Sequence, residues 1–234
     1  MSVLLSSVME QVDGYDVRVA RLGTDKIGTP LVLMHGYPEN LQVWCRLAPL
    51  LARERPVIAF DWPGMGESAP WKGGATPRQM AGRLRRLLDA WGLDQVHLLG
   101  SDMGGQPSLV AAALLPDRIR SVVVMNSLVM GHIETSWEIQ VLRQYGWNLK
   151  ILKHLPRIVF SRARQTFLAR QDSVPKVVLE DFWRCFRRPD VRQYIVRMCA
   201  GYQGQLAKLP DDYRRIACPV LVLWGDSDKH FPLK

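Results

Sequence analysis

The residues best suited to chemistry gather in a few short clusters, and the most informative is LLGSDMGGQ, Leu98 to Gln106. At its centre lies Asp102, flanked by Gly100, Gly104 and Gly105. This pattern is typical of the sharp strand-to-helix turn on which enzymes expose a nucleophile. The glycines are needed because the turn forces positive φ and the next helix packs close. At a helix N-terminus the free N–H groups favour the charged carboxylate, so we expect Asp102 to be ionised at neutral pH.

Such a turn needs a strand before it and a helix after it, and the sequence predicts both. Short apolar runs, each ending in Gly, Ser, Asn or Asp, alternate with helical patterns, which is typical of buried parallel strands. The runs are residues 30–36, 56–64, 95–101, 119–127 and 219–226. Helices are predicted from Pro77, after a Thr76 cap, to about Trp91, and from Gly104 to Leu115. A hairpin turning at Asp13–Gly14 precedes them. This order predicts an α/β fold with a mostly parallel sheet and helices on both faces.

The strand signal is missing from residues 128–215, where apolar residues recur at helical spacing. One more buried strand follows, so this region interrupts the sheet domain instead of following it. We therefore expect three segments: a first part of the core at 1–127, a helical insertion at 128–215, and a last core strand with its loop at 216–234.

Polar clusters follow four of the predicted strands, at the carboxyl ends where open α/β sheets bind ligands. They are HGYPEN (35–40), DWPGMGES (61–68), GSDMGG (100–105) and WGDSDKHFP (224–232). In this order the chain resembles the α/β-hydrolase superfamily, in the branch of epoxide hydrolases and haloalkane dehalogenases that uses an aspartate nucleophile. The resemblance covers nearly the whole chain, with residues 128–215 in the place of that branch's cap domain.

The resemblance implies that Asp102 is a nucleophile. A carboxylate needs no base to become nucleophilic, and it suits displacement at an sp³ carbon with formation of an alkyl-ester intermediate. The alternative is that Asp102 only caps the helix, but the flanking glycines and the HGYP motif favour the nucleophile. In that motif the N–H of Tyr37 is expected to form an oxyanion hole with the N–H of Met103. His35 is expected to be structural.

Members of this branch differ in the leaving group that they release and in the residues that assist its departure. Haloalkane dehalogenases usually carry Trp after the nucleophile and often Asn within HGxP, where this chain has Met103 and Tyr37. Fluoroacetate dehalogenases follow their nucleophile with arginines, which DMGGQ lacks. Epoxide hydrolases protonate the leaving oxygen with cap tyrosines, and the insertion offers Tyr145, Tyr194 and Tyr202. Tyr202 lies nearest to the family position, although a helical tyrosine is often a core residue. The sequence favours an epoxide hydrolase-like enzyme acting on a small apolar organic substrate, with a haloalkane or haloacid dehalogenase as the alternative.

Turnover of the ester requires a histidine base held by an acid. The W-G-x-x-D pattern of the family assigns the acid to Asp228. The histidine of the family follows one further helix and strand, whereas this sequence stops at Lys234, and neither His230 nor any other histidine matches. Two hypotheses remain open: a truncated form of an active hydrolase, whose final helix and strand are absent, or a complete but catalytically inactive relative that binds a ligand or partner.

Charge, cysteine spacing and the length of apolar runs indicate which classes of partner and cofactor to expect. The net charge of +9 comes mostly from residues 128–217, where arginines at helical spacing are expected to form a solvated face, so we expect no nucleic acid partner. The four cysteines show no CxxC spacing, and we expect no metal and no cofactor. No secretory signal or membrane-spanning run is visible, so we expect a cytoplasmic protein without membrane contact. The apolar last strand is expected to promote dimerisation or aggregation.

Overall fold

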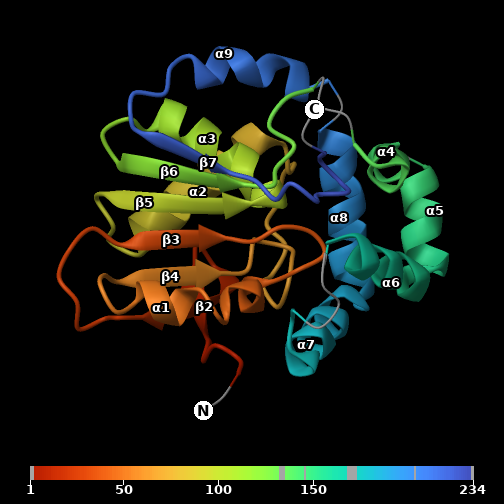
Figure 1. The fold of residues 1–234 in the computed structure, drawn as a ribbon, viewed down its shortest axis with the longest axis horizontal. Coiled ribbons are helices and arrows are strands. Elements are labelled where there is room, and N and C mark those ends of the chain that lie inside the picture. Colours follow the sequence, from red (N-terminus) through yellow and green to blue (C-terminus); the bar gives the residue numbers. More distant parts are fainter. Residues whose placement is uncertain (1–2, 132–134, 145, 168–172, 203, 233–234) are drawn as a thin grey trace.

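The computed structural model describes residues 3–131, 135–144, 146–167, 173–202 and 204–232. A seven-stranded sheet in the order β1-β2-β4-β3-β5-β6-β7 forms its centre. The strands are β1 (Val8–Val12), β2 (Tyr15–Leu22), β3 (Leu31–Met34), β4 (Val57–Phe60), β5 (Val96–Ser101), β6 (Ile119–Met125) and β7 (Val220–Leu223). Helices lie on both faces of the sheet, and the middle of the face toward the viewer is left open (Figure 1). This is the predicted α/β architecture.

The central strands of the sheet are parallel and buried. All four residues of β3 and of β4 are buried, as expected for central strands covered on both faces, and β3 pairs in parallel with β4 and β5. Strand β2 pairs antiparallel with both β1 and β4. With β1 it forms the predicted hairpin, which turns at Asp13 (φ 52°) and Gly14 (φ 80°). Positive φ at both turn residues matches the right-handed twist of the strands.

The helices begin and end where local chemistry favours it. Before α2 (Pro77–Ala90) the Thr76 side chain accepts a hydrogen bond from the backbone N–H of Gln79. The Gln79 side-chain oxygen in turn accepts the backbone N–H of Thr76, and the two bonds form a capping box. The other helices are α1 (Ala48–Leu51), α3 (Gly105–Leu114), α4 (Trp137–Arg143), α5 (Trp147–His154), α6 (Pro156–Phe167), α7 (Lys176–Phe186), α8 (Pro189–Gly201) and α9 (Leu209–Tyr213), with short 3₁₀ turns η1 (Leu41–Trp44), η2 (Asp102–Gly104) and η3 (Leu206–Lys208). The predicted helices after Thr76 and after the Asp102 turn are therefore both present.

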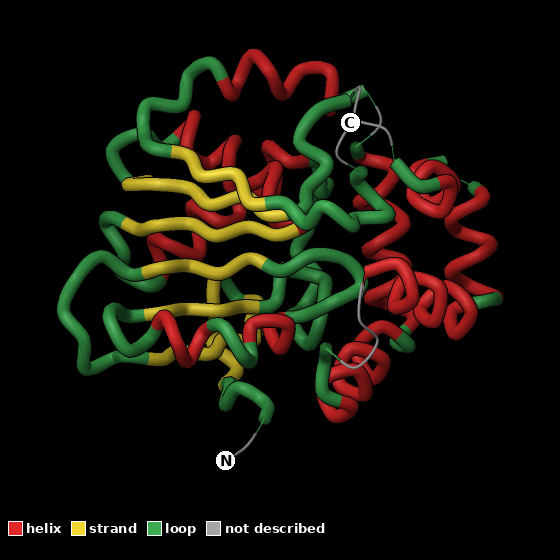
Figure 2. The backbone as a smooth tube through the Cα atoms, viewed as in Figure 1, coloured by secondary structure: helices red, strands yellow, loops and turns green. Residues whose placement is uncertain are grey.

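The helices of the insertion lie beyond the carboxyl ends of the parallel strands, toward which the strand arrows point (Figure 1). We refer to helices α4 to α8 as the cap. Figure 2 shows them as a helical layer beside the sheet. The last helix of the expected insertion, α9, packs against α3 of the core instead. The cap therefore closes over the sheet edge where the polar clusters lie.

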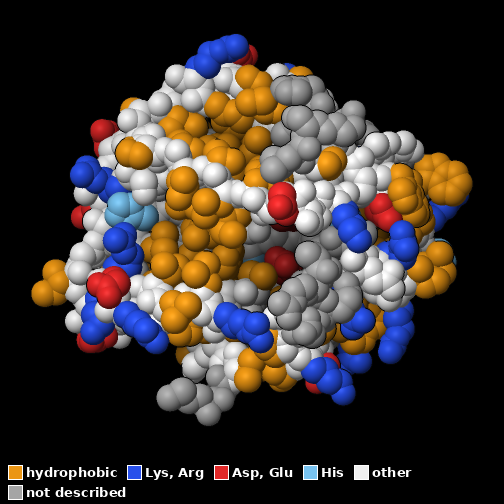
Figure 3. All heavy atoms as spheres, viewed as in Figure 1, with side chains coloured by type: hydrophobic (Ala, Val, Ile, Leu, Met, Phe, Trp, Pro, Cys, Tyr) orange, Lys and Arg blue, Asp and Glu red, His pale blue; other side chains and the backbone are white. Residues whose placement is uncertain are grey.

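Strand β7 pairs in parallel with β6, as predicted, and no described strand pairs with its other edge. Its side chains are exposed to solvent: the exposed fractions are 41% for Val220, 53% for Leu221, 61% for Val222 and 44% for Leu223. Figure 3 shows hydrophobic side chains gathered over the middle of the face in view, where the sheet lies. In the described part of the chain no helix is long and apolar enough to cross a membrane.

Candidate active site

Asp102 occupies a strained turn between β5 and α3. Its φ is 49°, in the left-handed region that most residues avoid, and the 3₁₀ turn of Asp102–Gly104 leads directly into the helix. Close neighbours fix this position: a Cβ on Gly36 would lie 2.4 Å from the Asp102 Cβ, and a Cβ on Gly104 would lie 2.4 Å from the Met34 carbonyl oxygen. Only glycine fits at either place, so these neighbours fix the aspartate on the turn.

Two backbone donors face the Asp102 carboxylate. The Tyr37 N–H donates to Oδ1 at 2.7 Å, and the backbone N–H of Met103 lies close enough to the carboxylate to lower its pKa. These are the two donors that the sequence assigned to an oxyanion hole. His35 holds the loop that carries Tyr37, because its Nε2 accepts the N–H of Trp62 at 3.1 Å. Burial lowers the pKa of His35 to about 4, so the ring is neutral and suits this structural position.

The burial of Asp102 opposes the ionised state that the helix N-terminus was expected to favour. Burial raises its pKa to about 7, against the opposing effect of hydrogen bonds from Tyr37 and Met103, and the nearby Asp228 raises it further. The side chain keeps some accessible surface, and that surface faces the pocket that Asp102 shares with cap residues. The helix N-terminus does not compensate for this desolvation, so both protonation states are populated near neutrality.

Asp228 lies on the loop after β7, near Asp102. Its Oδ2 accepts the side-chain amide of Asn126 at 2.5 Å, and its Oδ1 accepts the N–H groups of His230 at 2.8 Å and Phe231 at 3.0 Å. Asn126 ends β6 with a φ of 41°. Two neighbouring strand ends thus position the carboxylate that the sequence assigned as the acid.

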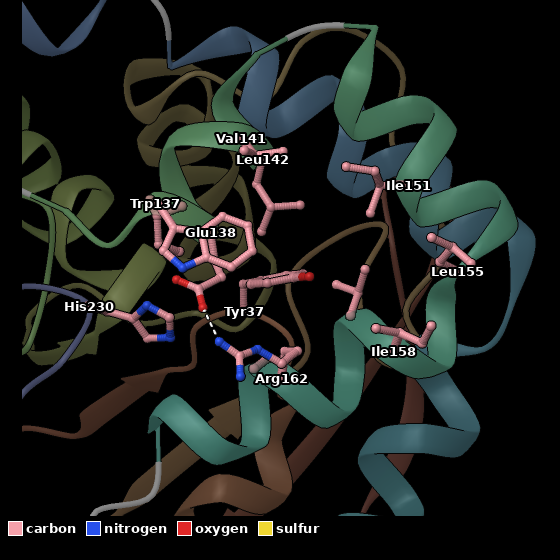
Figure 4. A pocket seen from close by; sticks show the side chains of 13 residues that line it. Tyr37, Trp137, Glu138, Val141, Leu142, Ile151, Leu155, Ile158, Arg162 and His230 are labelled. Atoms are coloured by element: carbon pink, nitrogen blue, oxygen red, sulfur yellow. Dashed lines mark hydrogen bonds and ion pairs between the residues drawn. The ribbon is translucent and has the colours of Figure 1, made fainter.

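Two chambers lie between core and cap. The smaller, of about 50 Å³, contains Asp102 and Met103 in its wall, and the larger, of about 180 Å³, lies among cap helices α4, α5 and α6. Tyr37, Ile139 and Leu142 line both chambers. Figure 4 shows the larger chamber, with the ion pair of Glu138 and Arg162 and the ring of His230 on one side and aliphatic side chains on the other.

The cap tyrosines have different surroundings. Tyr202 is 5% exposed and lines the smaller chamber together with Asp102, and its hydroxyl lies 3.9 Å from the Met80 sulfur. Tyr194 is directed elsewhere, because its hydroxyl bonds the Arg83 guanidinium. Tyr145 falls outside the described residues. Of the two candidates described, Tyr202 is the one near the nucleophile.

No histidine is among the described residues that line the smaller chamber. His230 instead lines the larger one, and its Nδ1 lies 2.8 Å from the Ser136 hydroxyl. His97 lies on β5 against Ser121, and His154 ends α5. His132 is outside the described residues. The sequence-based rejection of His230 as the base agrees with its place in the cap chamber.

Four further residues near the nucleophile were not identified from the sequence. Gln106, Arg143 and Cys199 line the chamber of Asp102. Gln106 could have been found, because it follows Asp102 by four residues and positions i and i+4 share a helix face. Glu39, in the HGYPEN cluster, lies close enough to Asp102 for that carboxylate, together with burial, to raise its pKa to about 8. Arg143 and Cys199 come from the cap, and no motif indicated them.

The fold agrees with comparisons to known proteins. Residues 29–234 match the family model described as the alpha/beta hydrolase fold, and the chain belongs to that family. The described residues hold no group of three or more His, Cys, Asp or Glu side chains arranged to bind a metal.

Individual relatives differ in their activities. The chain is 33% identical over 224 residues to the dihydrolipoyllysine-residue acetyltransferase component of the acetoin cleaving system of Pseudomonas putida, covering 95% of this chain but only 58% of that protein. It is 28% identical over 244 residues to a fluoroacetate dehalogenase of Burkholderia sp., covering 92% of this chain and 79% of the relative. The solved structure of epoxide hydrolase CorEH superposes with a TM-score of 0.75 at 20% identity, covering 97% and 92% of the two chains.

Proposed function

We propose that the chain carries the nucleophile and oxyanion hole of a hydrolase that forms an alkyl ester on Asp102, with epoxides as the preferred electrophiles. The observation that supports this most strongly is the 2.7 Å hydrogen bond from the Tyr37 N–H to Oδ1 of an aspartate on a positive-φ elbow. A carboxylate held through one oxygen has the other available to attack carbon. The same donors would stabilise the oxyanion when water attacks the ester.

In the first step a carboxylate oxygen forms a bond to an epoxide carbon while the carbon–oxygen bond of the ring breaks. The electron pair moves to the leaving oxygen, which then takes a proton from an acid. Tyr202 is the proposed acid, because it lines the chamber of Asp102 and burial keeps its pKa well above the ordinary value, so the phenol carries its proton. A thioether is a weak acceptor, so the contact with Met80 leaves the hydroxyl available to a substrate.

The second step needs a base to activate water, and Asp228 is proposed to orient it. No histidine lines the nucleophile chamber in the described part of the chain. We therefore propose that these 234 residues form the ester but do not turn it over. An inactive relative that only binds a ligand in the same chambers is the remaining alternative.

A haloacid dehalogenase is the second candidate, and one specific observation favours it. Arg143 reaches the chamber of Asp102 from α4 and would place a guanidinium near a substrate carboxylate. The stretch DMGGQ after the nucleophile has no arginine, but Arg143 of α4 could take the same role in binding a carboxylate. The 28% identity to a fluoroacetate dehalogenase is consistent with this candidate.

Intact-mass measurement after incubation with a terminal epoxide, the matched alkyl bromide and the matched 2-bromo acid distinguishes these candidates. We expect a persistent adduct that forms fastest with the epoxide. Asp102→Asn should form none, whereas Cys199→Ala should still be labelled, because burial raises the pKa of that thiol to about 12 and keeps it a poor nucleophile. Faster labelling by the bromo acid, lost in Arg143→Gln, would favour the dehalogenase. No adduct with any probe would leave only the binding protein.

A further inference from the structure

Tyr37 has a second polar group besides its backbone N–H. Its side-chain hydroxyl is buried, and no described residue provides it with a hydrogen-bond partner. The residue as a whole is 5% exposed. Buried polar groups in native proteins are nearly always hydrogen-bonded, so an unpaired one needs an explanation, and a ligand is one.

The surroundings of this hydroxyl are apolar. Figure 4 shows the Tyr37 ring reaching across the middle of the cap chamber, with its hydroxyl directed away from His230, Glu138 and Arg162. The chamber wall on that side consists of aliphatic side chains, among them Leu142 and Ile151. None of these three polar side chains hydrogen-bonds the phenol hydroxyl, and a ligand on that side of the chamber would meet one hydroxyl among aliphatic side chains.

Tyr37 also lies at the junction of the two chambers. Its N–H bonds Asp102 Oδ1, and its ring lines both cavities. A molecule that reacts at Asp102 and extends into the larger cavity must pass along this side chain. One residue would thus contact such a molecule at its reacting end through the backbone and along its tail through the phenol.

We propose that the Tyr37 hydroxyl selects substrates by their tail: elongated, mainly apolar electrophiles that carry an ether, hydroxyl or carbonyl oxygen about one tyrosine side-chain length from the reacting carbon. The proposal rests on the proposed function, because attack by Asp102 fixes the reacting end. Burial raises the pKa of the phenol well above its usual value, which keeps it protonated and able to donate to such an oxygen.

The test uses terminal epoxides with one tail length, in which an ether oxygen replaces a methylene at successive positions. The rate of adduct formation, followed by intact mass, gives a ratio of each ether epoxide to the hydrocarbon epoxide. One ether position should exceed its neighbours by about three- to tenfold, the range expected of one buried hydrogen bond. Tyr37→Phe keeps the backbone N–H and should abolish this preference. Comparing ratios between proteins removes the difference in hydration between ether and methylene.

Tyr213→Phe is the matched control, because it removes a phenol hydroxyl that donates to the Val129 carbonyl at 2.9 Å, away from both chambers. It should keep the positional preference. A wild-type protein without any preferred position, or a preference unchanged in Tyr37→Phe, overturns the proposal. An equal slowing of all epoxides in Tyr37→Phe also overturns it, because the hydroxyl would then act at the reacting end.

Binding of the corresponding unreactive diols, measured by calorimetry, separates this proposal from the proposed function. A preferred ether position that is lost in Tyr37→Phe supports the tail contact even when no epoxide labels the protein, which would contradict only the nucleophile. Labelling of Asp102 without positional preference leaves the nucleophile in place and contradicts only the tail contact.

Discussion

Asp102 combines a reactive position with an unfavourable environment. The elbow places the carboxylate against the Tyr37 N–H, while burial raises its pKa to about 7. Only the ionised form has the electron pair needed for attack on carbon. Its reactivity and its contribution to stability should therefore both change with pH, in opposite directions.

The first prediction concerns the rate of alkylation. Labelling of the protein by a neutral epoxide should rise with pH, reach half its maximum near pH 7 and level off above about 8, as Asp102 loses its proton. The rates come from intact-mass time courses between pH 5 and 9, corrected for hydrolysis of the probe in buffer. A rate that stays constant over this range would contradict a nucleophile with a raised pKa.

The second prediction concerns stability. Because the folded-state pKa of Asp102 is raised from 3.8 to about 7, the native state binds the proton more tightly than the unfolded state, and stability falls as pH rises through this window. Asp102→Asn removes the buried charge, so above pH 7 it should be more stable than wild type by on the order of 4 kcal/mol. The gain should shrink toward pH 4. Urea unfolding at pH 4.5 and 8 measures it, and an equal difference at both values would contradict the shift.

Among the elements, a buried ionic cluster connects the cap to the core. Arg18 on β2 lies 3.3 Å from Asp181 on α7 and 3.7 Å from Asp61, which follows β4. Asn40 donates to Asp181 at 2.8 Å, and the Leu41 N–H donates to Asp61 at 2.7 Å. The cluster therefore holds helix α7 against the loop that positions Tyr37.

The third prediction follows from this cluster. Arg18→Met keeps the apolar stem but leaves two buried carboxylates without their shared cation, which should destabilise the protein by about 3 to 5 kcal/mol. Arg214→Ala breaks the exposed pair with Asp211 and should change stability by less than about 0.5 kcal/mol. Urea unfolding of both variants makes the comparison. Similar small effects would mean that the cluster does not stabilise the cap.

Local elements were predictable because local patterns determine them. The apolar runs marked the parallel strands, Thr76 and Pro77 marked a helix start, and Asp13–Gly14 marked the hairpin. The contact between Asn40 and Asp181 spans 141 positions, and neither residue carries a pattern that indicates the other. Such contacts depend on how the cap packs, which periodicity does not encode.

At the level of the whole molecule, the site contains residues that local sequence patterns indicate and residues whose position depends on how the cap packs. Core residues at strand ends, Asp102, Met103 and Asp228, were predictable because parallel strands bring their carboxyl ends together. Arg143 and Cys199 enter from cap helices whose placement the sequence does not reveal. The raised pKa of Asp102 was also missed, because it arises mainly from burial in the folded structure, which a local motif does not encode.

The fourth prediction concerns β7. Its apolar side chains are 41% to 61% exposed, and it lacks lysine or an internal proline to discourage pairing with another chain. We expect the 234-residue chain to dimerise or aggregate at micromolar concentration, and Val222→Lys to reduce this. Ile27→Lys, which changes a 97% exposed side chain outside the strand, is the control and should have no effect. Light scattering that shows a monomeric wild type would contradict the expectation.

Locating the adduct within the chain tests the nucleophile most directly. After incubation with a terminal epoxide, peptide mass spectrometry should find the added mass on Asp102, and hydroxylamine should release it, as expected of an ester. Asp102→Asn should carry no adduct at this position or elsewhere in the chamber. An unmodified Asp102 after prolonged incubation, or a label at Cys199 or Glu39 that forms equally in Asp102→Asn, would contradict the account.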